Sequence, residues 1–165
     1  MRTIIPSIAI LAVLGLAYVE AGSTLLKKEE VPKAIQTLKS GTAQARAIAA
    51  ERLGHRGAVR SADVKDAVEP LRHALKNDAD VNVRKEAARA LGNIGRDLDE
   101  TVPALIDAMK ADKAMPVKVA AIQALGQIGP EARSALPDLQ KIAGDKSKKQ
   151  LTGPARQAIK SIKAR

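Results

Sequence analysis

The sequence predicts an all-α protein, an α-solenoid of about four helical hairpins, and three observations favour this class. The chain of 165 residues has no Phe, Trp or Cys, and its one aromatic residue is Tyr18. A core must therefore be built from Ala, Leu, Ile and Val, which favours closely packed helices over a sheet sandwich. Apolar residues recur at helical spacing. The same blocks also return at a nearly constant interval along the chain, which is typical of stacked units that cannot bury their apolar faces alone.

The segment 1–21 is typical of a secretory signal peptide. Arg2 precedes an apolar stretch from Ile4 to Val19, as in the charged and apolar regions of such a signal. Cleavage after Ala21 or Ala17 fits the small residues that a signal peptidase reads, and we favour Ala21. The stretch is shorter than the ~20 residues of a membrane-spanning helix. We therefore expect an exported protein, periplasmic or secreted; an uncleaved membrane anchor is the alternative.

A Leu-Gly-x-x-Gly block marks the repeating unit, at Leu53, Leu91 and Leu125. A shorter apolar block precedes each copy. We divide the chain into a linker over 22–30 and a repeat domain over 31–165, with repeats at about 31–57, 66–95, 99–129 and 130–163. A polar linker over 56–65 makes the first period longer than the second. The first unit is more polar than the others, with Arg52 and Arg56 on its apolar face, which suits a capping unit.

In the second and third units the second helix carries an apolar stripe at offsets 0, 4, 7, 8 and 11, one face of a helix with 3.6 residues per turn. In the second unit these positions are Val83, Ala87, Ala90, Leu91 and Ile94. Asp78 and Asp80 stand just before this helix, as expected for a turn and an N-cap. The preceding helix is shorter and has a narrower stripe. Each unit is therefore expected to be a helical hairpin.

The paired glycines of each unit have different expected roles. Gly57, Gly95 and Gly129 follow the last apolar turn, where a left-handed residue ends a helix without a Cβ penalty. The glycine three positions earlier in each unit lies within the helix, and we expect it to let a neighbouring helix approach.

Two units carry the clearest consensus. The second reads Val83-Arg84, Ala87, Ala90-Leu91-Gly92 and Ile94-Gly95, and the third repeats this pattern from Val117-Lys118. The pattern resembles HEAT repeats, more specifically the short HEAT-like repeats also found in bilin lyases, and the resemblance covers residues 31 to about 162. It implies an α-solenoid with a binding role, and such repeats serve many binding roles. A chromophore site would need aromatic contacts or a reactive group, and the chain that follows Ala21 has neither.

The inventory of reactive residues argues against an enzyme, a bound metal and a cofactor. The chain has no Gly-x-Ser-x-Gly motif, no phosphate-binding Gly-rich loop and no Cys, and His55 and His73 are its only histidines. A structural zinc site needs about four nitrogen or sulfur ligands. Asp97, Asp99 and Glu100 are better explained as complements to a helix dipole than as cation ligands.

We expect a non-catalytic scaffold that binds a protein or peptide partner through the surface of its stacked second helices. The candidate contacts are the polar residues that flank the apolar stripes: Arg84, Lys85, Arg89, Lys118, Gln123 and Gln127. Arg84 and Lys118 have a second interpretation, because they could instead pair with Asp78, Asp80 and Asp112 in the hairpin turns.

A basic C-terminal segment supplies an alternative function. The chain has 28 basic and 18 acidic residues, a net charge of +10. Six of the basic residues near its C-terminal end are Lys146, Lys148, Lys149, Arg156, Lys160 and Lys163. They form a candidate site for an anionic polymer or an envelope surface, or a solvated cap that keeps the array soluble. Export and the lack of aromatic residues for base stacking disfavour nucleic acid. A membrane is an expected partner only if the N-terminal segment stays uncleaved.

Overall fold

A computed structural model describes residues 25–145 and 147–164. These residues form helices without strands, which confirms the all-α solenoid. The expected signal peptide over 1–21, the first part of the linker over 22–30, and Lys146 lie outside the described residues. No helix in the described part of the chain has the length and apolar character needed to cross a bilayer.

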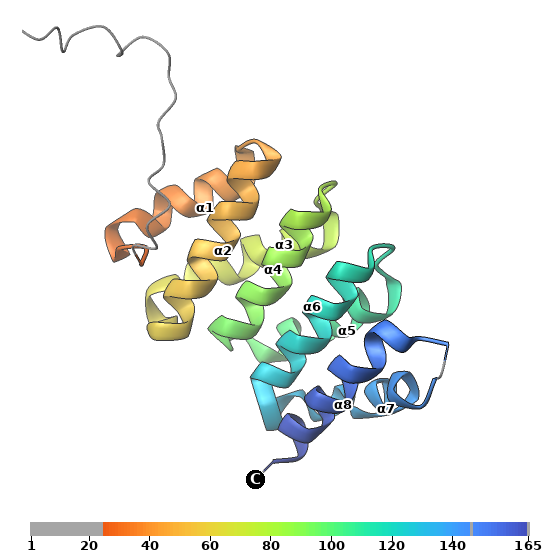
Figure 1. Ribbon diagram of the computed structural model, residues 1–165. Coiled ribbons are helices and arrows are strands. Elements are labelled where there is room, and N and C mark those ends of the chain that lie inside the picture. Colours follow the sequence, from red (N-terminus) through yellow and green to blue (C-terminus); the bar gives the residue numbers. More distant parts are fainter. Residues whose placement is uncertain (1–24, 146, 165) are drawn as a thin grey trace, which may run out of the picture.

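Four hairpins follow one another along the chain (Figure 1). Their helices are α1 (Val31–Ser40) and α2 (Ala43–Val59), α3 (Val68–Asn77) and α4 (Val81–Ile94), α5 (Leu98–Ala111) and α6 (Met115–Ile128), and α7 (Leu136–Gly144) and α8 (Lys149–Lys163). Short 3-10 helices precede the first, second and fourth hairpins: η1 (Lys28–Glu30), η2 (Ser61–Ala67) and η3 (Gly129–Ala135).

The helices form two layers. The second helices α2, α4, α6 and α8 lie side by side in one layer, and the first helices α1, α3, α5 and α7 lie behind them (Figure 1). Second helices of successive hairpins pack much more closely than first helices do. The stack is therefore tightest along the second-helix layer, and grooves open between the first helices.

The predicted apolar stripes form the core. Leu53, Leu91 and Leu125 are each at most 1% exposed, and the first-helix positions Val68 and Leu71 are equally buried. One stripe position differs from expectation, because Ile128 at the end of α6 is only half-buried. All four hairpins share this continuous core, so each depends on its neighbours for burial of its apolar face.

Close approach of the second helices depends on glycine facing alanine. A Cβ at Gly92 would lie 2.6 Å from the Cα of Ala124. The same arrangement recurs between the neighbouring hairpins, where Gly54 faces Ala90 and Gly126 faces Ala158. Real Cβ atoms do not approach a backbone so closely, so any larger residue would push the helices apart. The expectation that these glycines admit a neighbouring helix is confirmed.

The prediction for the three helix-ending glycines is correct in full for Gly95 and in part for Gly129, which has a positive φ but not the left-handed helical ψ. Gly95 has φ 58° and ends α4, and Gly129 has φ 80° at the end of α6. The prediction for Gly57 is wrong, because α2 continues to Val59 and Gly57 lies inside it. Gly57 is buried, and a Cβ there would overlap the side chain of Ile94. Its role is close packing against the next hairpin.

The polar linker predicted over 56–65 is also wrong. The segment continues α2 to Val59 and then forms η2. Val64 is fully buried within η2, and Arg56 forms a half-buried ion pair with Asp63. The extra length of the first period therefore builds an additional turn of ordered structure.

Candidate functional site

A row of paired charges connects the hairpin turns, beginning at Arg46 and Asp78. The guanidinium of Arg46 in α2 donates two hydrogen bonds to the Asp78 carboxylate, at 2.7 Å and 2.8 Å. Its remaining nitrogen donates to the carbonyl oxygen of Gly41 at 2.8 Å. Asp78 in turn accepts from the backbone N–H of Asp80 at 2.9 Å. One ion pair thus ties the turn of the first hairpin to that of the second.

Arg84 repeats this arrangement one hairpin later. It donates to both oxygens of Asp112, at 2.8 Å and 3.1 Å, and to the carbonyl oxygen of Asp78 at 2.9 Å. Asp112 accepts from the backbone N–H of Ala114 at 2.8 Å. The Arg84 and Asp112 side chains are only 14% and 8% exposed. Lys118, at the corresponding position of the third hairpin, donates to the carbonyl oxygen of Lys110 at 3.2 Å.

The electrostatics of this row favour the charged forms. Burial by itself raises the pKa of Asp78 and of Asp112, but hydrogen bonds from Arg46 and Arg84 and from the backbone outweigh it, and each pKa is lowered. The pKa of Arg84 is raised, first through its hydrogen bond to Asp112. A bidentate Arg–carboxylate pair also fixes the relative orientation of its two side chains more tightly than a Lys–carboxylate pair does.

Of the two interpretations of Arg84, its contacts support the pairing with a hairpin turn. Its guanidinium satisfies the Asp112 carboxylate and two backbone carbonyls, so its hydrogen-bonding capacity is largely used within the fold. We call Arg46, Asp78, Arg84, Asp112 and Lys118 the turn ladder. Its two Arg–Asp pairs tie the first hairpin to the second and the second to the third, whereas the contact of Lys118 lies within the third hairpin.

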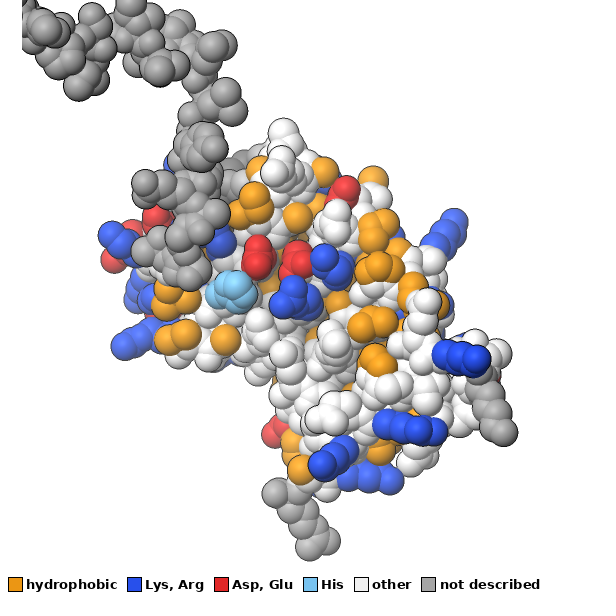
Figure 2. Space-filling view, viewed as in Figure 1, with side chains coloured by type: hydrophobic (Ala, Val, Ile, Leu, Met, Phe, Trp, Pro, Cys, Tyr) orange, Lys and Arg blue, Asp and Glu red, His pale blue; other side chains and the backbone are white. Residues whose placement is uncertain are grey.

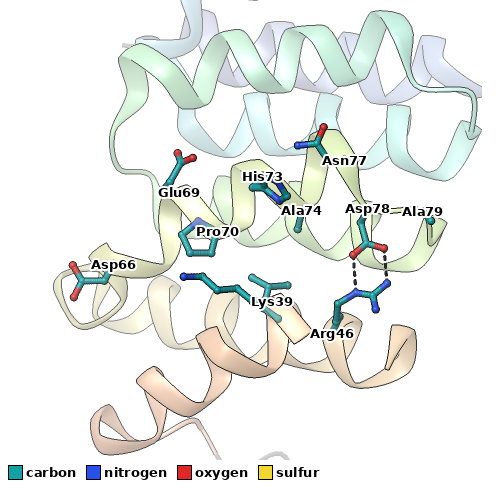
Figure 3. A pocket seen from close by; sticks show the side chains of 11 residues that line it. Lys39, Arg46, Asp66, Glu69, Pro70, His73, Ala74, Asn77, Asp78 and Ala79 are labelled. Carbon is teal, nitrogen blue, oxygen red and sulfur yellow. Dashed lines mark hydrogen bonds and ion pairs between the residues drawn. The ribbon is translucent and has the colours of Figure 1, made fainter. Parts of the chain in front are cut away.

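Two grooves flank α3 on the first-helix side. The first lies between α1 and α3, has a volume of 720 Å³, and includes Lys39, Glu69 and His73 in its lining. Figure 3 shows the Arg46–Asp78 pair at one end of it and Asp66 at the other. The second, of 970 Å³, lies between α3 and α5, and Arg72 crosses it to pair with Glu100. Both grooves are strongly charged, with acidic and basic groups intermixed.

A third groove, of 570 Å³, lies on the second-helix side. Its lining comes from α4, α6 and the start of α8: Lys85, Arg89, Met115, Pro116, Val119, Ala120, Gln123 and Gln150. We call it the second-helix groove. Apolar and amide side chains supply most of the lining, and the charged groups that the described residues contribute to it are the two cations Lys85 and Arg89. Three of the predicted contacts, Lys85, Arg89 and Gln123, meet in it.

One carboxylate holds the two cations of the second-helix groove. Glu86 pairs with Lys85 at 3.1 Å and with Arg89 at 3.1 Å. The Glu86 side chain is only 12% exposed, whereas that of Arg89 is 51% exposed. Two positive charges therefore share one half-buried negative charge, and the wall of the groove keeps a net positive charge that faces solvent.

The remaining predicted contacts lie outside the groove. Gln127 is exposed one turn after Gln123, and its side-chain oxygen lies close to Gly92. Arg84 and Lys118 belong to the turn ladder. The groove residues that sequence reasoning missed are Met115, Pro116, Val119, Ala120 and Gln150. Met115 and Pro116 begin α6, and apolar residues at that position gave no signal to distinguish them from core.

The space-filling view shows the second-helix side (Figure 2). Apolar side chains extend across α2, α4 and α6, with a small group of acidic and basic side chains among them, and Lys and Arg gather over α8. Four of the six residues predicted to bind anions are Lys149, Arg156, Lys160 and Lys163, which are exposed on α8. Lys148 pairs with Asp145 at 3.3 Å.

The described residues contain no group of three or more acidic, His or Cys side chains arranged to hold a metal ion. Asp99 and Glu100 lie in the first turn of α5, and Glu100 pairs with Arg72. His55 and His73 are both exposed.

Stacked hairpins with a shared core, a register-setting ladder and an open groove define a helical-repeat solenoid. The family model for HEAT repeats matches residues 31–114 and 68–160, and the chain belongs to the HEAT-repeat family. Comparison with curated proteins finds no match. HEAT-repeat solenoids generally serve as scaffolds for protein interactions.

Proposed function

We propose that this protein is an exported, non-catalytic scaffold that binds a protein partner through the surface of its stacked second helices. The general role of HEAT repeats in protein interaction supports the first part of the proposal. Export rests on the signal-like sequence over 1–21, with its Arg2 and its apolar stretch. The choice of surface rests on the second-helix groove.

The lining of that groove is the observation that carries the proposal. Val119 and Ala120 form an apolar floor, the amide of Gln123 can both donate to and accept from a peptide backbone, and Lys85 and Arg89 stand on one wall. Since these cations share one carboxylate, that of Glu86, among the residues that the structure describes, a ligand carboxylate would find an unneutralised positive charge. The chemistry fits an extended peptide segment with small apolar side chains and an acidic residue.

Charged substitutions on the two layers test the surface. In the groove variant, Val119→Glu with Gln123→Glu places two negative charges against an acidic peptide. The matched control, Ala104→Glu with Gln140→Glu, makes the same change in charge on α5 and α7; Ala104, like Val119, is half-buried, and Gln140, like Gln123, is exposed. A photo-crosslinker at position 123 first captures the partner from the exported fraction, and the purified partner is then titrated against each variant.

We expect the groove variant to lose at least tenfold in affinity, about 1.4 kcal/mol, while the control variant binds as the wild type does. Both should show wild-type helical circular dichroism. Equal affinity of the two variants, or loss confined to the control, would contradict the choice of surface.

Export is tested separately by the intact mass of the protein recovered from the host. Cleavage after Ala21 predicts a chain that begins at Gly22, and cleavage after Ala17 predicts one that begins at Tyr18. Recovery of the uncleaved chain from the membrane fraction would contradict export and support the anchored alternative.

A further inference from the structure

Four basic residues of α8 lie on one face of the helix. Lys149, Arg156, Lys160 and Lys163 are separated by 7, 4 and 3 positions, which at 100° per residue places them within an arc of about 60°. All four are exposed. At a rise of about 1.5 Å per residue the row is roughly 21 Å long. We call it the α8 basic row.

The row carries charges of one sign only. The sequence of α8 contains no Asp or Glu, and none of the four cations takes part in an ion pair among the described residues. Several cations elsewhere in the described residues are neutralised, for example Arg72 by Glu69 and Glu100, and those that are not lie scattered over different helices and turns, as Lys33, Lys65 and Lys113 do. The α8 basic row is therefore a concentration of unneutralised positive charge.

The place of the row in the stack follows from the glycine contacts. Ala158 packs on Gly126 as Ala124 packs on Gly92. In this register Arg156 stands where α6 has Ile122, which is fully buried against the next hairpin, and Lys160 stands where α6 has Gly126. The row thus lies on the face of the fourth hairpin that points away from the other three described hairpins.

The need to cover an exposed face with polar residues does not by itself explain why the α8 basic row has cations and no carboxylates. An end face needs polar residues to keep water in contact with it, and neutral or mixed charges would serve, since soluble surfaces normally intersperse both signs. Four cations without an acidic neighbour cost electrostatic repulsion that a mixed face avoids. A ligand with several negative charges would remove that repulsion.

We propose that the α8 basic row binds a linear polymer that carries sulfate or phosphate groups. A straight row of about 21 Å matches an extended chain better than a single anion, and each contact releases counterions from the polymer. A membrane surface fits less well, because the described part of α8 exposes no large apolar side chain for insertion. The site is separate from the second-helix groove and does not depend on the proposed protein partner.

The test uses the full chain with two variants of equal net charge. The row variant carries Lys149→Gln, Arg156→Gln, Lys160→Gln and Lys163→Gln. The control variant removes four exposed cations that the structure leaves without ion pairs on other helices and turns: Lys33→Gln, Lys39→Gln, Lys65→Gln and Lys113→Gln. Binding to heparin and to polyphosphate is measured between low and moderate salt, with neutral dextran as the blank.

We expect the wild type and the control variant to bind both polymers, and the row variant to lose most of the affinity. The slope of log K against log salt should fall by about three for the row variant, since each lost contact removes roughly 0.7 to 0.9. Equal losses in the two variants would show that net charge alone drives binding and would overturn the proposal. So would binding to anionic phospholipid vesicles without binding to either polymer.

Discussion

Gly92 of α4 lies so close to α6 that a Cβ at this position would come within 2.6 Å of the Cα and 2.7 Å of the Cβ of Ala124. The contact sets the spacing of the two central second helices. It also determines how the side chains of α4 and α6 face the groove between them, because Lys85 and Val119 lie one or two turns away from this contact on the same helices.

Replacement of this glycine should therefore be destabilising. An alanine within a helix usually stabilises by about 0.5 to 1 kcal/mol relative to glycine. In Gly92→Ala the added methyl group meets backbone atoms that cannot rotate away, and we expect a net loss of about 1 to 3 kcal/mol in the free energy of unfolding. Urea denaturation followed by circular dichroism gives this value.

Gly153→Ala is the matched control for that substitution. Gly153 lies inside α8, and a Cβ there meets nothing within 4 Å. We expect it to change stability by less than about 1 kcal/mol, because the helix propensity gained over glycine is offset by the restriction that Pro154 places on a preceding residue with a Cβ. If both substitutions stabilised the protein, the close contact between α4 and α6 would be refuted.

The Arg84–Asp112 pair should contribute to stability through coupling between hairpins. Because both side chains are largely buried, removal of one partner leaves the other unsatisfied, and Arg84→Ala should cost about 1 to 3 kcal/mol. A double-mutant cycle with Asp112→Asn measures the interaction, which we expect to exceed about 0.5 kcal/mol. Strictly additive effects would mean that the pair does not couple the second and third hairpins.

The lowered pKa values of Asp78 and Asp112 predict acid sensitivity. A carboxyl group whose folded pKa lies below its unfolded value, about 3.9, contributes stability that is fully present above the unfolded value and is lost as pH falls through the folded pKa. The stability difference between wild type and Asp78→Asn with Asp112→Asn should be constant from about pH 5 to 7 and shrink below about pH 4. Unfolding titrations at each pH test this, and an identical difference at pH 3 and pH 7 would contradict it.

Gly95 gives a prediction for backbone conformation. Its φ is 58°, and a Cβ there meets no atom closer than 4.0 Å, so the effect of substitution is conformational. We expect Gly95→Ala to cost about 1 to 2 kcal/mol, and Gly95→Asn to cost less because Asn tolerates the left-handed region. Thermal unfolding ranks the two variants, and the reverse order would contradict the left-handed helix end.

The fold could be predicted in detail because its information is local and repeated. The apolar spacing from Val83 to Ile94 recurs in successive units, so the same helical pattern predicts which residues are buried in each of those units. Gly57 was mispredicted because a glycine that ends a helix and one that packs against a neighbour occupy the same place in the pattern. What distinguishes Gly57 is its contact with Ile94, a residue of the next hairpin that the local pattern does not include.

The candidate site was predictable only in part. Helical phase places Lys85, Arg89 and Gln123 on one surface, and they meet in the second-helix groove. Met115 was missed because an exposed apolar residue in a first turn has the same sequence signature as a core residue. Gln150 was missed because it reaches the groove from the next hairpin, and phase within one helix gives no information about that contact.

Methionine oxidation in the presence of the purified partner tests the central claim most directly. Met115 is 39% exposed at the groove, whereas Met109 in the core is 1% exposed. Hydroxyl-radical footprinting of the complex should slow the oxidation of Met115 strongly and leave that of the exposed His73, on the first-helix side, unchanged. Unchanged oxidation of Met115 with protection of His73 would place the partner on the other layer and contradict the account.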